Sequence, residues 1–317
     1  MDVSIVVVNW NTKKLLRGCL QSIKDHAGEI DYEIIVVDNA SSDGSAAMVL
    51  SEFGDVVLIT NKTNRGYAAG ANNGIRIATG RYVLILNSDI LICNSAIAKI
   101  VKYADNHPEG AVFGCQIREL SGKVHMTCFR FPTLLNLFLR LSGLARVFSH
   151  HRFFGREMML WWNRQNEQEV DVVSGMFLLV RQEAIQPVGL MDEDYFFYFE
   201  ETDWCYRFSK KGWKMLFWPG ACTIHLGAGS QSNPQVALKV YVQRQKNLLL
   251  FFAKHYSLSS YALAWLLLTI NSFARGAGWA IIKSSKQLSG KNANYEINNM
   301  QKHWWAFKFC VLGREPS

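Results

Sequence analysis

The sequence predicts an α/β protein with a mostly parallel sheet that is covered by helices on both faces, followed by a helical C-terminal extension. Strand-like and helix-like segments alternate through the first third of the 317-residue chain, and repeated units of this kind are typical of parallel sheets. The strand-like runs are almost continuously apolar, as in strands buried on both faces. From Lys239 onward, long apolar runs are combined with a surplus of basic residues.

The first three strand–helix units can be followed directly along the chain. The expected strands are VSIVVVNW at 3–10, YEIIVVDN at 32–39 and VVLITN at 56–61. The helices are expected at 13–26, after the polar cluster ASSDGS at 40–45, and around 69–78. In the first helix Leu16, Leu20 and Ile23 recur at helical spacing, and the polar cluster is suited to capping the second helix.

The fourth expected strand, YVLILNSDILI at 82–92, is an apolar run interrupted by Asn87, Ser88 and Asp89. These small polar residues are either a loop that leaves the core or part of a binding site. Ligands of parallel sheets bind beyond the carboxyl ends of the strands. That edge is expected to gather the polar residues that end the strands: Asn9, Asp38, Asn39, the loop after Asn61, and Asp89.

The second half of the chain alternates less regularly. Between about 125 and 170, aromatic and basic residues are interleaved, and we expect a helical excursion that serves as a lid or faces a membrane. A strand and the start of a helix are expected at 169–184. Within 189–213 a short acidic helix should end at Gly212, and a strand from 214 should lead into a loop that carries His225.

The amino-acid composition indicates a globular protein. Hydrophobic residues make up 49% and charged residues 19% of the chain, which is typical of a globular protein. The seven cysteines are scattered without a CxxC pair, so we expect a reducing compartment and neither a disulfide framework nor a zinc site. Strand-like sequence starts at once after Met1, so no signal peptide is expected.

The net charge of +8 belongs to the C-terminal part. From Lys239 onward there are 11 Lys and Arg against two acids, Glu296 and Glu315, whereas the preceding 238 residues carry 23 bases and 24 acids. Such a surplus beside apolar helices suits an anionic lipid surface.

The apolar run at 261–282 is as long as a bilayer span, but Asn271, Ser272 and Arg275 interrupt its middle. Three interpretations stay open. We favour helices that lie on a membrane surface; packing in a core or in a homodimer interface comes second, and a true span third.

Seven short motifs follow one another along the chain: SIVVVNWNT, EIIVVDNASSDGS, TNKTNRGYAAGANNGI, GRYVLILNSD, VSGMFLLVRQEA, YFEETDWCYRFSKKGW and IHLGAGS. Their order resembles the family-2 glycosyltransferases of the GT-A fold, especially the rhamnosyltransferase-type members that build bacterial surface polysaccharides. The resemblance covers residues 1 to about 230. It implies a GT-A domain at 1–238, with a nucleotide-sugar-binding half at 1–115 and an acceptor half at 116–238, before the extension at 239–317.

The resemblance implies that the sheet edge binds a nucleotide sugar. Asp38 would accept a hydrogen bond from a pyrimidine N3–H, which implies uridine or thymidine; capping of the following helix is the alternative role. The glycines of NRGYAAGANNG, which include Gly66, are spaced four apart and do not form the dinucleotide fingerprint. They would admit the nucleotide close to the backbone, with Asn64 and Asn72 as polar contacts, or else serve loop and helix packing. Further contacts are expected from Asn9, Asn87, Ser88, Asp89 and Gly175.

Asp89 would hold Mg²⁺ or Mn²⁺. These cations take oxygen ligands and commonly need one or two carboxylates plus the phosphates of the substrate. The metal would stabilise the charge on the leaving nucleotide as a Lewis acid. The family often has an acidic pair around one intervening residue, and here Asn87 stands in the first place. His225 matches a family position that can complete the coordination, with a merely hydrogen-bonded histidine as the alternative.

The motif FEETDW matches the position of the family's catalytic base. Inverting transfer needs a carboxylate that takes the proton of the acceptor hydroxyl as its oxygen attacks the anomeric carbon. The family usually reads Glu-Asp-x-Asp, so Glu201 replaces an aspartate and reaches one methylene further. We expect Glu201 to be the base, with Asp203 second and Glu200 beside them; the alternative is acids that merely decorate a helix start. Arg207 is expected to pair with Asp203.

We therefore expect an inverting, metal-dependent glycosyltransferase that uses a dTDP- or UDP-sugar. The resemblance favours an L-rhamnosyl donor, with UDP-hexose and UDP-galactofuranose as alternatives, and a glycan acceptor linked to polyprenyl diphosphate at the cytoplasmic membrane face. The basic, apolar extension fits an acceptor that stays in the bilayer. The competing hypotheses are a non-catalytic GT-A-like scaffold or nucleotide-sugar-binding protein, and nucleic-acid binding through the tail, for which no motif is found.

Overall fold

The computed structural model describes residues 1–227, 234–289 and 292–313. The chain forms two compact units. One consists of Met1–Phe131 with Glu157–Ala228, and the other of Pro132–Arg156 with Gly229–Ser317. A segment from the middle of the chain thus belongs to the same unit as the C-terminal helices, a grouping for which the sequence holds no local signal.

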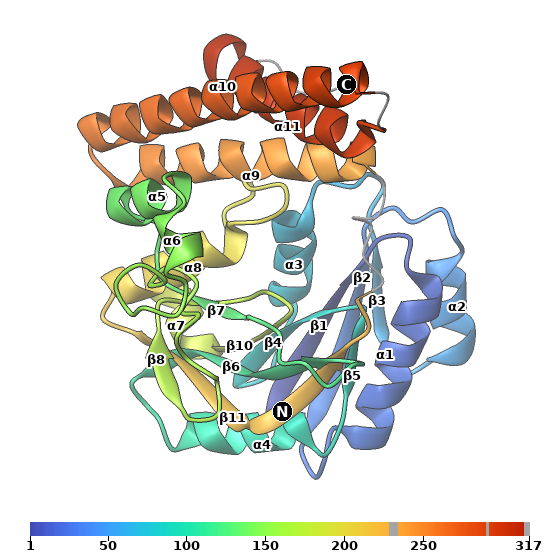
Figure 1. Cartoon of the computed structure of the whole chain (residues 1–317). Coiled ribbons are helices and arrows are strands. Elements are labelled where there is room, and N and C mark those ends of the chain that lie inside the picture. Colours follow the sequence, from blue (N-terminus) through green and yellow to red (C-terminus); the bar gives the residue numbers. More distant parts are fainter. Residues whose placement is uncertain (228–233, 290–291, 314–317) are drawn as a thin grey trace. The chain divides into compact units, whose positions relative to one another are not determined.

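The first unit is built around one mixed sheet (Figure 1). Its strands lie in the order β3 (Val57–Thr60), β2 (Tyr32–Asp38), β1 (Val3–Asn9), β4 (Tyr82–Asn87), β10 (Phe177–Arg181), β6 (Gly110–Glu119), β11 (Lys214–His225) and β5 (Ile90–Ile92), with β8 (Gln168–Val170) beside β11. β3, β2, β1 and β4 pair parallel with one another, as do β6 and β11, whereas β10, β5 and β8 run antiparallel to their neighbours. The predicted α/β architecture with a mostly parallel sheet is confirmed.

The run at 82–92, expected as one strand, forms two. β4 ends at Asn87, and β5 begins at Ile90 at the other end of the strand order, where it pairs antiparallel with β11. The backbone of β5 therefore pairs with β11, while the buried side chains of Ile90 and Ile92 join the same core as Leu84 and Leu86 of β4. The polar residues between the two strands mark a change of position within the sheet.

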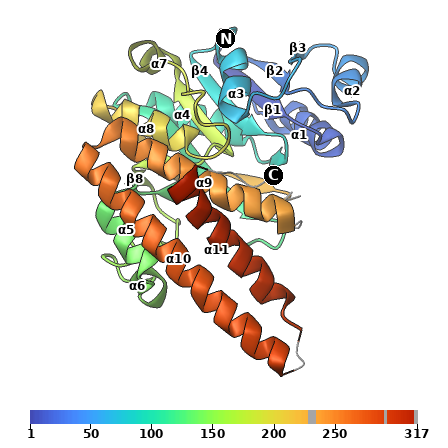
Figure 2. The ribbon, with the colours of Figure 1, turned by 90° about the horizontal axis from the view of Figure 1, so that it is seen from above.

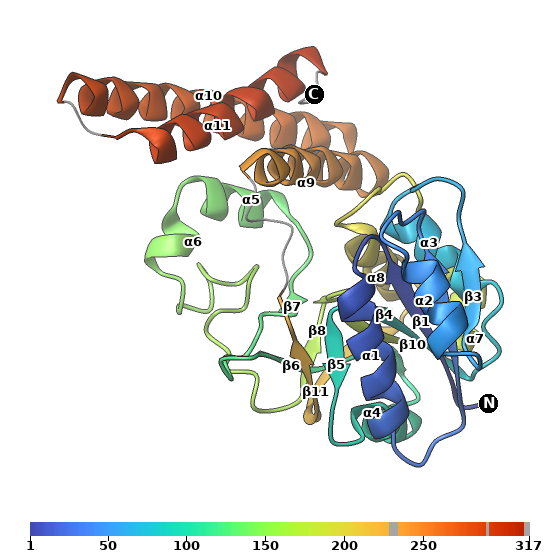
Figure 3. The same cartoon turned by 90° about the vertical axis from the view of Figure 1, so that its right-hand side faces the viewer.

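The second unit is helical. It contains α5 (Leu134–Leu141), α6 (Leu144–Val147), α9 (Pro234–His255), α10 (Leu258–Leu288) and α11 (Asn294–Leu312). α10 and α11 lie side by side (Figure 2), and Trp265 Nε1 donates to the Cys310 carbonyl at 2.8 Å. α5 and α6 form the helical excursion expected between 125 and 170 (Figure 3). Before and after this excursion in the chain lie β7 (Cys128–Phe129) and β9 (Val172–Val173), which pair as a two-stranded sheet in the first unit.

The apolar run at 261–282 lies inside α10. Across the parts of the chain that the structure describes, no helix is both long and apolar enough to cross a bilayer. One side of α10, with Ala264, Leu268, Ser272 and Gly276, is buried in the unit. The ring of Trp304 lies 3.2 Å from where a Cβ on Gly276 would sit, which shows how closely α11 packs there.

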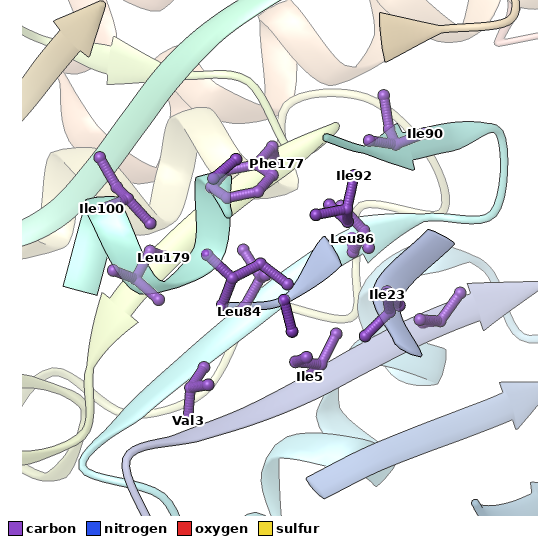
Figure 4. Packing of buried hydrophobic residues seen from close by; sticks show 14 of the residues in the cluster. Val3, Ile5, Ile23, Leu84, Leu86, Ile90, Ile92, Ile100, Phe177 and Leu179 are labelled. Carbon is purple, nitrogen blue, oxygen red and sulfur yellow. The ribbon is translucent and has the colours of Figure 1, made fainter. Parts of the chain in front are cut away.

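Helices cover both faces of the sheet in the first unit. α1 (Lys13–His26), α2 (Ser45–Glu52) and α4 (Ala96–Asp105) pack on one face, and α3 (Tyr67–Ile75), α7 (Gln182–Val188) and α8 (Glu200–Lys210) on the other. Successive side chains of a strand point to opposite faces, so Val3 and Ile5 enter the first core and Val6 enters the second. Figure 4 shows the first core. These two cores hold the strand ends, and with them the polar residues that follow, in fixed positions.

Candidate active site

The carboxyl ends of β1 and β2 carry a buried pair of polar side chains. Asn9 and Asp38 end their strands opposite each other, and Asn9 Nδ2 donates to Asp38 Oδ1 at 2.9 Å. Asp38 Oδ2 accepts from the Ser41 amide at 3.0 Å. The alternative role of Asp38 as a helix cap is wrong, because α2 starts at Ser45 and Asp43 accepts from the Ser45 amide. The chain itself thus orients the Asp38 carboxylate at the sheet edge.

A hydroxyl network joins this pair to the residues that follow β4. Thr12 Oγ1 donates to Asn9 Oδ1 at 2.6 Å and lies 2.8 Å from Ser88 Oγ. β1 pairs with β4 in parallel register, which brings Ser88 to the same edge as Asn9. The strand ends that the sequence analysis expected at one edge do meet there, and Thr12, which nothing in its motif singled out, connects them.

Asparagine side chains hold the loops that follow β2 and β3. Asn39 Nδ2 donates to Asn64 Oδ1 at 3.0 Å and to the Gly66 carbonyl at 2.9 Å, and Asn64 Oδ1 also accepts from the Gly66 amide. Gly66 has φ of +95°, and a Cβ there would lie 2.3 Å from the Phe196 carbonyl oxygen. The close backbone approach at Gly66 is therefore made by another part of this chain, and Asn64 shapes the loop that allows it.

Asn72 fastens the segment before α8 to α3. Its side chain is 1% exposed, with Nδ2 donating to the Met191 carbonyl at 2.9 Å and Oδ1 accepting from the Met191 amide at 3.0 Å. Nδ2 also donates to Glu193 Oε1 at 3.0 Å, and Arg65 and Arg76 form ion pairs with Glu193. In this structure the Asn72 amide positions a neighbouring segment.

The Tyr67 hydroxyl lies where several expected site residues meet. It is 2.9 Å from Asn87 Oδ1 and 3.0 Å from the Gly175 carbonyl oxygen. A Cβ on Gly175 would lie 3.7 Å from the Tyr67 ring and 4.0 Å from Glu201 Cβ. The strand ends of β4 and β10 and the start of α8 are thus brought together around one phenol.

Three carboxylates act on this phenol. Burial, followed by the electrostatic effect of the nearby acids Glu200, Glu201 and Asp89, raises the pKa of Tyr67 well above its ordinary value. Acids from α8 and from the β4–β5 connection are therefore close enough to share one electrostatic environment. Sequence reasoning missed Tyr67 because an aromatic residue in the first turn of a helix is most often a core residue.

The backbone that leads into the three acids at the start of α8 is strained. Tyr198 and Phe199, which directly precede the helix, have φ of +71° and +74°. Left-handed backbone at residues with bulky side chains costs about 1–3 kcal/mol each and persists where the surroundings impose it. Here the bond from the Tyr67 amide to the Phe196 carbonyl, at 2.7 Å, helps to impose it.

The three acids differ in their surroundings. Asp203 is 1% exposed and forms an ion pair with Arg207 at 2.7 Å, as predicted, while Arg207 also donates to the Val188 and Leu190 carbonyls. Glu200 is 3% exposed, and burial together with the charge of Glu201 raises its pKa well above the ordinary value. Glu201 is half-buried beside Gly175.

Asp89 and His225 meet across the β5–β11 pairing. His225 Nε2 lies 3.0 Å from Asp89 Oδ2, with both side chains partly exposed. Ile90 pairs with His225 in the antiparallel register, and the Leu226 amide donates to the Asp89 carbonyl at 2.9 Å. The hydrogen bond to Asp89 raises the pKa of His225 against the opposing effect of burial.

The chemistry of this pair fits a divalent cation in part. Asp89 Oδ1 is buried and has no hydrogen-bond partner among the described residues, so one carboxylate oxygen is available as a ligand. No group of three or more His, Cys, Asp or Glu side chains suited to a metal occurs in the described ranges. The residues therefore suit Mg²⁺ or Mn²⁺ that takes its remaining ligands from substrate phosphates and water.

His125 is a further neighbour that the motifs did not indicate. Its ring packs edge-on against His225 at 5.1 Å between centroids, and its Nδ1 is buried without a partner among the described residues. Burial and the adjacent His225 lower the pKa of His125. The residue lies in the irregular part of the sequence, where no periodicity could have placed it.

Comparison with known proteins indicates the family to which the chain is similar. Residues 4–161 match the family model described as glycosyl transferase family 2. The chain is 27% identical over 242 residues to the N-acetylglucosaminyl-diphospho-decaprenol L-rhamnosyltransferase of Mycobacterium tuberculosis, covering 71% of this chain and 76% of that protein. It is 25% identical over 235 residues to the rhamnosyltransferase WbbL of Escherichia coli, covering 70% and 83%.

A solved structure shows the same fold. The mannosyltransferase PcManGT from Pyrobaculum calidifontis, in complex with GDP-Man and Mn²⁺, aligns with a TM-score of 0.58 at 17% identity, covering 99% of this chain and 88% of that chain. The GT-A architecture expected from the motifs is thereby confirmed.

Proposed function

The chain belongs to glycosyl transferase family 2, and on that basis we propose that it is an inverting enzyme that transfers an L-rhamnosyl group from a dTDP- or UDP-sugar to a lipid-linked glycan. The names of two relatives support the sugar, and the name of one includes a diphospho-decaprenol acceptor. UDP-hexose and UDP-galactofuranose remain the alternative donors. The acceptor would be a glycan on polyprenyl diphosphate.

The observation that carries the proposal is the position of Glu201. This carboxylate is half-buried, lies beside Gly175, and shares the surroundings of Tyr67 with Asp89. It would take the proton of the acceptor hydroxyl as that oxygen bonds to the anomeric carbon. The bond from the anomeric carbon to the diphosphate breaks on the opposite side, the proton ends on Glu201, and the negative charge leaves with the nucleoside diphosphate.

The neighbouring acids support Glu201 as the base. Burial and the adjacent charge of Glu201 raise the pKa of Glu200 and favour its protonated form. Asp203 is engaged by Arg207, which also donates to the Val188 and Leu190 carbonyls and so holds α8 against the segment at 188–190. These two acids would fix the charge and the place of the base without contacting the acceptor.

The sheet edge supports the donor half of the proposal. Asp38, held by Asn9 and Ser41, would accept from the N3–H of uracil or thymine. Asn87 and Ser88 would contact the sugar and diphosphate. The Gly175 position, where only distant atoms would meet a Cβ, would let the substrates approach the backbone.

Asp89 and His225 would hold Mg²⁺ or Mn²⁺. When bound, the cation would stabilise the charge that develops on the leaving diphosphate as a Lewis acid. Replacement of Asp89 by Ala should therefore weaken binding of Mn²⁺ in the presence of UDP, as measured by calorimetry. Unchanged Mn²⁺ affinity of that variant would remove Asp89 from the metal site.

The site of action would be the cytoplasmic face of the membrane, with the protein held there as a peripheral protein. A polyprenyl-linked acceptor stays in the bilayer, and the extension at 239–317 carries all of the chain's net positive charge. Bases beside exposed apolar side chains favour an anionic lipid surface. A homodimer is the alternative use of the apolar side chains of α10.

The decisive experiment compares Glu201→Gln with Glu200→Gln. Transfer from dTDP-L-rhamnose, UDP-hexoses and UDP-galactofuranose to a short-chain polyprenyl-diphosphate glycan is measured by product mass. Glu201→Gln should lower kcat by about 10²–10⁴-fold, whereas Glu200→Gln, which resembles the protonated acid already present, should retain most activity. Donor binding is measured in parallel by calorimetry.

Each outcome is informative. Equal activity of wild type and Glu201→Gln would exclude Glu201 as the base. Binding of a nucleotide sugar by the wild type without transfer or hydrolysis would support the non-catalytic scaffold and refute the enzyme. Product that retains the anomeric configuration of the donor would contradict the inverting mechanism.

A further inference from the structure

The segment at 132–156, here named the α5–α6 segment, presents a surface that is both apolar and basic. Five of its large apolar side chains are exposed, by 39% to 72%: Leu135, Phe138, Val147, Phe148 and Phe153. The same residues are interleaved with four arginines, at 140, 146, 152 and 156, and with two histidines, and the segment contains no acid.

This exposed surface is held by the fold. The side chain of Thr133 caps α5 by accepting from the Asn136 amide at 3.1 Å, and the Tyr256 hydroxyl donates to the Pro132 carbonyl at 2.7 Å. Leu137 and Leu139 are 1% and 3% exposed and anchor α5 within its unit. The outward apolar side chains therefore belong to a docked helix, and their exposure is a property of the folded unit.

α5 carries apolar side chains on its outward side as well as on its buried side, with Asn136 and Arg140 as its polar residues. Leu137 and Leu139 point into the unit, while Leu135 and Phe138 point outward. Contiguous exposed apolar patches mark interaction surfaces. Beyond α6, the rings of Phe148, Phe153 and Phe154 extend this surface by packing against one another at 5.1–5.3 Å.

The charge of the unit indicates what would cover this surface. The unit formed by 132–156 and 229–317 contains 15 Lys and Arg but two Glu, whereas the other unit contains 19 bases and 24 acids. A partner that matches aromatic and aliphatic side chains as well as this positive charge must present an apolar layer behind an anionic one. A bilayer with anionic headgroups has that construction.

We propose that the α5–α6 segment is the element that inserts into the surface of an anionic bilayer. The inference rests on the proposed function for its biological setting, and deepens it by assigning the membrane contact to a segment in the middle of the chain. Phe138, Phe148 and Phe153 enter the boundary between headgroups and acyl chains, where the apolar side chains of interfacial segments are buried. The arginines contact lipid phosphates.

The exposed apolar side of α10 is the competing surface. Leu263, Leu266, Ile270 and Phe273 are exposed there, but the sequence between Lys254 and Arg275 contains no Lys or Arg. That stripe therefore lacks the interleaved positive charge that distinguishes the α5–α6 segment. It fits a surface buried by a second copy of the chain better than a charged lipid surface.

Sedimentation of the full-length protein with vesicles of phosphatidylcholine, with and without phosphatidylglycerol, tests the inference. The wild type should bind the anionic vesicles and release them at high salt. The double variant Phe148→Ser/Phe153→Ser should bind at least about tenfold more weakly, since burying each such side chain contributes more than enough for that factor. Arg146→Gln/Arg152→Gln should lose about fivefold per arginine on anionic vesicles.

Matched controls remove apolar surface elsewhere. Leu50→Ser removes an apolar side chain that is 70% exposed in the other unit. Leu266→Ser/Ile270→Ser removes two exposed apolar side chains from α10. Both should bind vesicles like the wild type. Circular dichroism and thermal melting check that every variant is folded, and light scattering gives the oligomeric state.

The outcomes separate this inference from the proposed function. Lack of wild-type binding to anionic vesicles, or loss of binding in the α10 variant and not in Phe148→Ser/Phe153→Ser, overturns the inference. Dissociation of a solution dimer by Phe148→Ser/Phe153→Ser without an effect on vesicle binding also overturns it. Transfer to a water-soluble acceptor analogue should be unchanged in Phe148→Ser/Phe153→Ser. If the wild type shows no transfer but binds vesicles through Phe148 and Phe153, the proposed function is refuted and the membrane contact is supported.

Discussion

Two arginine–carboxylate pairs of this protein have nearly the same geometry and very different surroundings, which yields a sharp prediction about stability. Arg207 Nε lies 2.7 Å from Asp203 Oδ2, and Arg17 Nε lies 2.6 Å from Glu52 Oε2. The side chain of Asp203 is 1% exposed, whereas that of Glu52 is 42% exposed. We predict that Arg207→Ala destabilises the protein severely and that Arg17→Ala changes its stability little.

The magnitude follows from what each substitution leaves behind. Removal of Arg207 strands the Asp203 carboxylate in a buried position, and breaking a buried pair in this way costs about 3–5 kcal/mol. Arg207 is itself 26% exposed, so water can replace part of its interaction, and we expect a loss near the lower end, about 3 kcal/mol. The carbonyls of Val188 and Leu190 lose their donor as well. Removal of Arg17 leaves a carboxylate that water already reaches.

Urea unfolding followed by circular dichroism measures both effects. The midpoint should fall strongly for Arg207→Ala and stay close to wild type for Arg17→Ala, with similar slopes for both. Arg207→Lys keeps the charge but not the planar fork that reaches Asp203 and two carbonyls together, so its loss should lie between the two. In the double variant Arg207→Ala/Asp203→Asn much of the loss should be recovered, because no buried charge remains unpaired.

Removal of Arg207 should also disturb the candidate active site, because α8 carries Glu201. Because Arg207 ties α8 to the segment at 188–190, its loss should lower kcat for transfer more than it raises the KM of the donor. A loss of stability for Arg207→Ala no greater than that for Arg17→Ala would show that burial does not govern these pairs. The reasoning about the α8 anchor would then be refuted.

Three further predictions concern buried groups and backbone. Burial lowers the pKa of His303 from 6.5 to about 4. The stability that its neutral form contributes is therefore complete above pH 6.5 and should decline by up to about 3 kcal/mol as the pH falls towards 4. In thermal melts, His303→Gln should show a smaller decline than the wild type. The raised pKa of Glu200 means that its stabilising protonated form is complete below about pH 4.5 and is lost as the pH rises. Glu200→Gln should therefore gain stability relative to wild type between pH 5 and pH 8, and a constant difference would contradict this. Gly66→Ala should cost about 1–3 kcal/mol because its Cβ would meet the Phe196 carbonyl, whereas Gly122→Ala, at φ +82° with nothing within 4 Å, should cost less; equal melting temperatures would refute the packing argument.

The strands of the first unit could be predicted because their cause is local. A buried strand must be apolar along its length, and β1, β2 and β4 are written in the sequence as such runs. The polar residues that end them are equally visible, and the parallel register then places Asn9 beside Asp38. The division of 82–92 into β4 and β5 could not be predicted, because the partner of β5 lies in β11, more than 100 residues later.

The polar residues of the loops are harder to interpret for the same reason. Asn64 and Asn72 occur in a glycine- and asparagine-rich motif that suggests ligand contacts, yet their amides bind Gly66 and Met191. An exposed amide and an amide that clamps a distant segment look alike in a sequence. Tyr67 was overlooked in the opposite way, because its ring resembles a core residue and its hydroxyl gains significance only beside Asn87.

The position of Glu201 shows how chemistry and geometry separate in this fold. The acids that could serve as a base are written in one motif, FEETDW. The place of that motif, however, depends on contacts outside it: Asn72 with Met191, Gly66 with Phe196, and Arg207 with Val188. The segment between these contacts includes the left-handed backbone at Tyr198 and Phe199, which carries an unfavourable conformational energy. A chain that kept the motif but lost these three contacts would retain a carboxylate of the right kind without the position on which its proposed role as base depends. We therefore expect the three contacts to be as necessary to the proposed reaction as the acid whose position they fix.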